Sequence, residues 1–101
     1  MLLQTYTMSK TKKTIKFHGL EVDNVIVRYS QSEINSPDKI KIEELDARKD
    51  PQSFETVNIQ VVSDFVTITF YKKESDNIVI RRELIPTHSV EHIWVSDLQQ
   101  Q

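Results

Sequence analysis

Residues 57–71 read VNIQVVSDFVTITFY and carry the strongest fold signal in the chain. β-Branched and aromatic residues, which suit a pleated and half-buried surface, dominate this stretch. Apolar and polar residues alternate along it, and the side chains of a strand point to two faces with a period of two. The apolar residues that would share the inner face are Val57, Ile59, Val61, Val66, Ile68 and Phe70. The pattern predicts two antiparallel strands with one face buried and one face in water.

Two further segments of the same kind follow this pair. Residues Ile78–Ile85 predict a third strand, and residues Val90–Val95 predict a closing strand. The alternation slips at Arg81-Arg82, which indicates a β-bulge or two basic side chains on opposite faces of an edge strand. Pro86 is expected to end the ladder because it has no N–H group to donate.

The joints between these strands are short and polar. Ser63-Asp64 has the length of a hairpin turn but lacks the glycine that tight primed turns prefer, so we expect a longer loop or a bulge there. Asp76-Asn77 tolerates a positive φ better than most residue pairs and predicts a turn.

The N-terminal half contains two more candidate strands. Thr14–Phe17 predicts a short strand, and His18-Gly19 predicts the turn after it. Glu21–Ser30 predicts a second strand. Its centre, Val25–Val27, is apolar on both faces, which is typical of a strand covered on both sides and indicates a central position.

Residues 36–49 support two interpretations. Ser36-Pro37-Asp38 is typical of a helix start. Lys39–Glu43, however, alternates between charged and apolar residues, as a strand with one solvated face does. We favour the strand and keep one short helix between Ser36 and Lys49 as the alternative. The charged, aperiodic residues of Glu44–Glu55 predict a loop, and loops on a rigid sheet often carry function.

The chain is therefore expected to fold as a mainly β protein, a small antiparallel sandwich or partly open barrel of six or seven strands. The alternative is an α+β fold with the short helix named above. Residues 1–13 are expected to form a flexible polar and basic arm, residues 14–98 a single β-rich domain, and residues 99–101 a tail. The predicted core includes Val27, Ile59, Ile68, Phe70 and Ile80.

Composition excludes several classes of function. Hydrophobic residues make up 38% and charged residues 28% of the chain, which suits a globular domain rather than a disordered one. A formal net charge of -2 provides no field that attracts nucleic acid or an anionic membrane, and no apolar run is long enough to span a bilayer. Cysteine is absent, so disulfides and thiolate metal sites are excluded and we expect a cytoplasmic protein.

Catalytic motifs are weak in this sequence. Its single glycine, Gly19, excludes phosphate-binding loops and nucleophile elbows, which need several glycines at fixed spacing. Residues His88–His92 match the H-x-x-E-H pattern of zinc proteases, but that chemistry requires both histidines on one helix face, and Pro86 and the β-rich surroundings argue against a helix. We therefore expect no catalytic residues, no metal and no cofactor.

Two binding surfaces remain as hypotheses. A basic and aromatic sheet face would suit single-stranded nucleic acid, and its candidate residues are Arg28, Tyr29, Tyr71, Lys72, Arg81 and Arg82. A closing strand without lysine or proline would suit a protein partner or a second copy of the chain, and its candidate contacts are Ile93, Trp94 and Val95. We favour a non-enzymatic protein-binding or assembly module that acts through this edge and adjacent loops. A homodimer fits the same hypothesis, and a nucleic-acid-binding accessory protein is the alternative.

Overall fold

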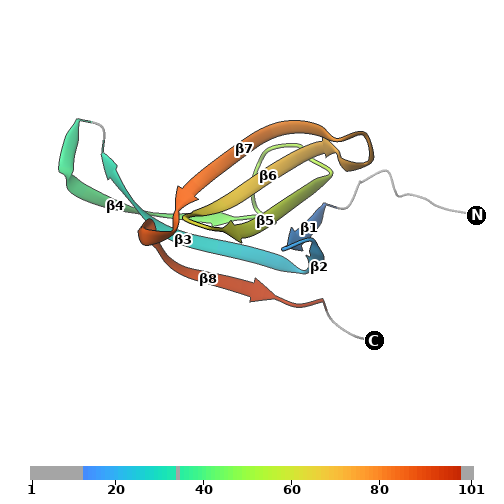
Figure 1. Cartoon of the computed structure of the whole chain (residues 1–101), viewed down its shortest axis with the longest axis horizontal. Coiled ribbons are helices and arrows are strands. Elements are labelled where there is room, and N and C mark those ends of the chain that lie inside the picture. The colour runs from blue at the N-terminus through green and yellow to red at the C-terminus, as the bar shows by residue number, and fades with distance from the viewer. Residues whose placement is uncertain (1–12, 34, 99–101) are drawn as a thin grey trace, which may run out of the picture.

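The computed structural model describes residues 13–33 and 35–98. Strands dominate this part of the chain, and two short 3₁₀ helices interrupt them. The strands are β1 (Thr14–Phe17), β2 (Leu20–Val22), β3 (Asn24–Glu33), β4 (Ser36–Asp46), β5 (Thr56–Val62), β6 (Phe65–Lys73), β7 (Ile78–Pro86) and β8 (Val90–Ser96). The 3₁₀ helices are η2 (Glu74–Asp76) and η3 (Thr87–Ser89). The prediction of a mainly β domain is confirmed (Figure 1).

Two segments differ from the expected elements. The alternative helix between Ser36 and Lys49 is wrong, because residues 36–46 form β4, in which Ser36 and residues 40–46 pair with β3. The predicted strand Glu21–Ser30 is divided at Asp23, whose N–H donates to the Ser96 carbonyl at 2.7 Å. The two halves of that segment belong to different sheets, and this division raises the number of strands in the described chain to eight.

The strands form two sheets, as expected for a small sandwich. One sheet has the order β2-β1-β5-β6-β7, and the other has the order β4-β3-β8. β1 and β5 pair in parallel, while the other paired strands are antiparallel. β3 is the central strand of the smaller sheet, as its apolar centre predicted.

The hydrophobic core draws its residues from both sheets. Its largest side chain, Phe70, meets the ring of Phe54 edge to face with centroids 5.1 Å apart. Four of the five predicted core residues are fully buried: Val27, Ile59, Ile68 and Phe70. The fifth, Ile80, is 39% exposed. It is the extra residue of a β-bulge, because Phe70 pairs with Arg81 while Tyr71 pairs with Val79.

The turns follow local backbone preferences with one exception. Asn77 adopts a left-handed conformation with φ 54°, as expected for the Asp76-Asn77 joint. The longer loop or bulge predicted at Ser63-Asp64 is wrong, because Val62 and Phe65 pair directly and leave a two-residue turn. Ser63 takes the positive φ that glycine would normally supply, at 54°.

Part of the β3–β4 hairpin projects beyond the two packed sheets (Figure 1). We call residues 31–33 and 35–42 the hairpin arm. Nearly all its described residues are exposed, because neither face of this part of the hairpin meets the other sheet. Of the predicted N-terminal arm only Lys13 lies within the described residues, and its Nζ donates to the Asp50 carbonyl at 2.8 Å. The predicted tail, residues 99–101, lies outside them.

Candidate interface at the sheet edges

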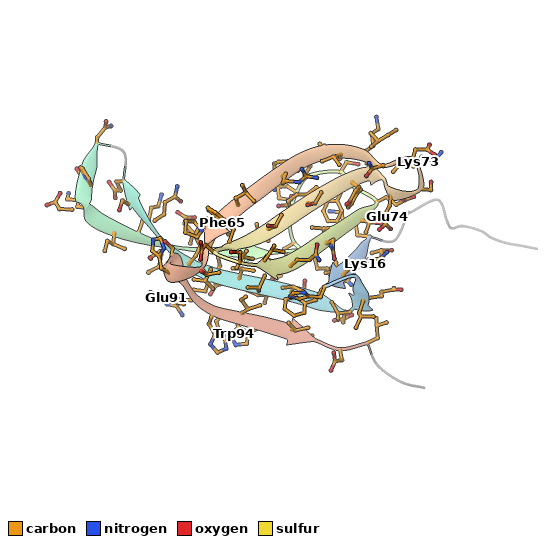
Figure 2. All side chains as sticks on the ribbon, viewed as in Figure 1. Lys16, Phe65, Lys73, Glu74, Glu91 and Trp94 are labelled. Atoms are coloured by element: carbon orange, nitrogen blue, oxygen red, sulfur yellow. The ribbon has the colours of Figure 1, made fainter. Side chains whose placement is uncertain are left out.

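The outer edge of β8 is the first candidate site. Among the described residues β8 pairs with β3 alone, so the backbone groups on its other side have no strand partner. Trp94 pairs with Ile26 on the outer face of the smaller sheet and is 41% exposed. Figure 2 shows the Trp94 side chain on the side of β8 that points away from the other strands. The imidazole of His92 lies beside the indole, with ring centroids 4.3 Å apart. β8 therefore combines an open backbone edge with an exposed aromatic pair.

The three predicted contact residues on β8 differ in their surroundings. Ile93 pairs with Val27 and packs against the core, so its side chain faces inward. Val95 pairs with Val25 and remains partly exposed near the end of the strand. The side chains of Trp94 and Val95 are therefore exposed, whereas that of Ile93 is partly buried.

The conformation of β8 follows from local contacts at both ends. Near its start the register with β3 shifts between Arg28 and Tyr29, which leaves Glu91 as a bulged residue. Arg28 approaches that residue, with Nε 3.7 Å from Oε1 of Glu91. At its end the Ser96 carbonyl accepts the Asp23 N–H. These contacts fix the direction of the strand but leave its outer edge open.

β7, one of the two edge strands of the larger sheet, carries more protection than β8. Ile80 forms its bulge, and Pro86 ends it, as predicted. Arg81 and Arg82 lie on opposite faces, since Arg81 pairs with inward Phe70 while Arg82 pairs with Thr69.

Arg81 lies at the centre of a partly buried ionic cluster. Its guanidinium covers the ring of Phe70 at 4.2 Å. One nitrogen, Nη2, donates to Oδ2 of Asp50 at 3.0 Å, and Nε lies 2.8 Å from Oε2 of Glu83, outside hydrogen-bonding geometry. The Asp50 side chain is only 11% exposed, and its other carboxylate oxygen, Oδ1, accepts the Gln52 N–H at 2.9 Å. Sequence patterns did not identify this cluster, because Asp50 is distant from Arg81 along the chain.

Tyr29 faces the same cluster from the smaller sheet. Burial raises the pKa of the Tyr29 hydroxyl, and the negative charges of Glu83 and Glu43 raise this pKa further. Tyr29 also lines a groove of about 500 Å³ between the hairpin arm and the end of β7, whose walls include Ile40, Leu84 and Pro86.

The six candidate nucleic-acid contacts do not share one face. Arg28 lies on the outer face of the smaller sheet, whereas Tyr29 points inward. Tyr71 and Arg82 lie on the outer face of the larger sheet. Lys72 lies beside a hollow next to Phe54, and Arg81 points into the ionic cluster. The basic and aromatic face predicted from the sequence is therefore divided between separate surfaces.

The H-x-x-E-H motif does not form a helix. His88 lies in η3, and His92 lies in β8. In residues 13–33 and 35–98 no group of three or more metal-ligating side chains comes together. No helix within the same ranges is long and apolar enough to cross a membrane.

No family model, curated protein or solved structure matches this chain. The interpretation of the site thus rests on its own residues. Beyond the predicted contacts, the structure exposes two apolar groups that the sequence did not single out. One group lies at the β5–β6–β7 end of the larger sheet and contains Val62, Phe65 and Leu84. The other lies on β4 and contains Ile40 and Ile42. The alternating pattern predicted that these residues lie in strands, but it did not predict that no other part of the described chain covers their side chains.

Proposed function

We propose that this protein is a cytoplasmic, non-enzymatic protein-binding module that receives an extended partner segment along β8. The observation that carries the proposal is the open edge of β8 beside the exposed indole of Trp94. An extended peptide added to a sheet edge gains affinity from main-chain hydrogen bonds and specificity from neighbouring side chains.

Each part of β8 has a distinct role in this proposal. The backbone of Ile93 and its neighbours supplies donors and acceptors, while the inward Ile93 side chain keeps the strand attached to the core. Trp94 and His92 supply an aromatic anchor, and aromatic residues are frequent in the energetic centre of interfaces. β8 contains no lysine or proline, which often block strand addition, and beyond the bulge at Glu91 its residues 92–96 pair regularly with β3.

Nucleic-acid binding is the weaker alternative. Stacking and phosphate contact require aromatic and basic groups on one surface. The ionic cluster occupies Arg81, and Arg28 and Arg82 belong to different sheets.

Capture from an extract of the source cell tests the proposal. Three immobilised baits are compared with and without nuclease: the wild type, Trp94→Ala and Leu84→Ala. Leu84 is the matched control because it is a large apolar residue, more than half exposed, on the other sheet edge. We expect partner proteins that bind the wild type and Leu84→Ala, resist nuclease, and are lost with Trp94→Ala.

Two outcomes would contradict the proposal. Equal capture by Trp94→Ala and the wild type would remove β8 from the interface. Loss of all captured proteins after nuclease treatment would favour the nucleic-acid alternative.

A further inference from the structure

β4 forms the other edge of the smaller sheet, opposite β8, and its residue pattern is self-complementary. It is the longest strand of the described chain, with 11 residues, and it pairs with β3 alone there. Ile40 and Ile42 are 69% and 44% exposed. A long edge with exposed apolar residues is a template for pairing with another chain, and because β4 also carries Pro37, Lys39 and Lys41, it favours a partner strand whose charges complement its own.

The charges along β4 determine which partner fits this edge. Lys41 and Glu43 are two residues apart and share one face, and Lys41 Nζ lies 3.3 Å from Oε2 of Glu43 within the chain. An antiparallel second copy with the two-fold axis at Ile42 places Lys41 opposite Glu43 of the partner at two equivalent positions. The same register places Ile42 opposite its own copy. Opposite charges and apolar residues facing each other across strands stabilise a sheet.

Neighbouring registers that keep the same faces together each place two like charges opposite one another at the two-fold axis itself, whereas the Ile42 register places an apolar pair there. With the axis at Lys41, this residue would face its own copy, and with the axis at Glu43 the two carboxylates would face each other. Like charges directly opposite destabilise a strand pair. The Ile42 register brings Asp38 opposite Asp46, but only at the ends of the pairing, where the Asn24 side chain already donates to Asp46 at 2.9 Å.

We propose that two copies of this chain associate through β4, in antiparallel register about Ile42. Pairing at this edge extends the smaller sheet to the order β8-β3-β4-β4-β3-β8. Such a contact is symmetric and closed, as in most homodimers. The dimer keeps both β8 strands at its outer edges. If β8 binds partners as proposed above, the dimer is bivalent and gains avidity for a partner with repeated segments.

Charge variants of the full chain test the register, with mass measured by light scattering and sedimentation. We expect the wild type to dimerise. Lys41→Glu and Glu43→Lys should each raise the dimer dissociation constant at least about tenfold, because each creates two like-charged pairs. The double variant Lys41→Glu/Glu43→Lys should dimerise again. An equimolar mixture of the two single variants should form a heterodimer, because all four facing charges are then opposite.

Control measurements distinguish the loss of the β4 contact from unfolding of the variant and from the loss of binding at β8. Circular dichroism is expected to show wild-type strand content in every variant. Lys73→Glu, on the other sheet, should dimerise like the wild type, and Trp94→Ala should remain dimeric while losing partners. A monomeric wild type, single variants that dimerise normally, or a Trp94→Ala variant that becomes monomeric would overturn the β4 interface. Loss of partner capture by Trp94→Ala would still support the function of β8.

Discussion

The edge strands β7 and β8 differ in how well they are protected against pairing with a strand of another chain. Both strands leave one side without a partner in the described chain. β7 carries a bulge, two arginines and a terminal proline, which all discourage strand addition. β8 also has a bulge, at Glu91, but it carries no lysine, arginine or proline within residues 90–96 and exposes Trp94. This contrast supports the proposal that β8 binds a partner, because an edge with little protection is otherwise an aggregation hazard.

The largest expected effect concerns the core beneath the protected edge. Phe70 is fully buried below Arg81, whereas Phe65 on the same strand is exposed. Phe70→Ala should lower the free energy of unfolding by about 3–5 kcal/mol, because it removes packing and leaves a cavity. Phe65→Ala should cost about 1 kcal/mol or less. Chemical denaturation measures both, and similar losses would show that the assigned inner face of β6 is wrong.

The two ion pairs near these edges provide a second comparison. Arg81→Ala leaves the Asp50 carboxylate in a mostly buried position without its cation, and we expect a loss of about 1–3 kcal/mol. Arg28→Ala removes an exposed pair with Glu91 and should cost less than about 1 kcal/mol. Denaturation in low and high salt measures these losses. An Arg81→Ala protein as stable as the wild type would show that the ionic cluster does not stabilise β7.

Neighbouring residues of β8 should separate folding from binding. Ile93→Ala removes a side chain that packs against the core, and we expect it to cost about 2 kcal/mol of stability. Trp94→Ala should cost about 1 kcal/mol or less, since the indole points away from the core. Thermal unfolding of both variants provides the measurement. A larger loss of stability in Trp94→Ala than in Ile93→Ala would place the Trp94 side chain in the core and exclude it as the interface anchor.

The smallest effect is a pH dependence at Tyr29. The pKa of its hydroxyl is raised above the ordinary value of 10.0, so the folded state holds this proton more tightly than the unfolded state. The resulting stability is fully present below the unfolded pKa and is lost as the pH rises through the folded pKa. The wild type should therefore lose more stability than Tyr29→Phe above about pH 10. If the free energy of unfolding depended on pH in the same way for both proteins, ionisation of Tyr29 would not be coupled to folding.

Much of the fold could be predicted from local pattern. Alternation identified β5 and β6. The slip at Arg81-Arg82 was predicted as a bulge or as two basic side chains on opposite faces of an edge strand, and the structure has a bulge one residue earlier, at Ile80. Local pattern could not reveal the break at Asp23, because it depends on a hydrogen bond to distant Ser96. It also misplaced Ile80, because a bulge changes the side-chain parity of the residues around it.

The candidate site was predictable only in part. The lack of lysine and proline in residues 90–95 identified β8, and the structure places this strand at an edge. Its division into inward Ile93 and outward Trp94 follows from pairing with Val27 and Ile26, which the sequence does not specify. The sequence predicted β4 only as a strand with one solvated, charged face, because its lack of a facing surface depends on how far the hairpin arm projects (Figure 1).

Site-specific photo-crosslinking in the source cell tests the central claim, that β8 is the contact strand, most directly. A p-benzoylphenylalanine residue is placed at position 92 on β8 or, as the control, at position 84 on β7. Both positions are exposed on the outer faces of their sheets. We expect discrete crosslinked partner proteins from position 92 and none from position 84. Crosslinks from position 84 alone, or equal crosslinks from both positions, would contradict the assignment of β8 as the interface.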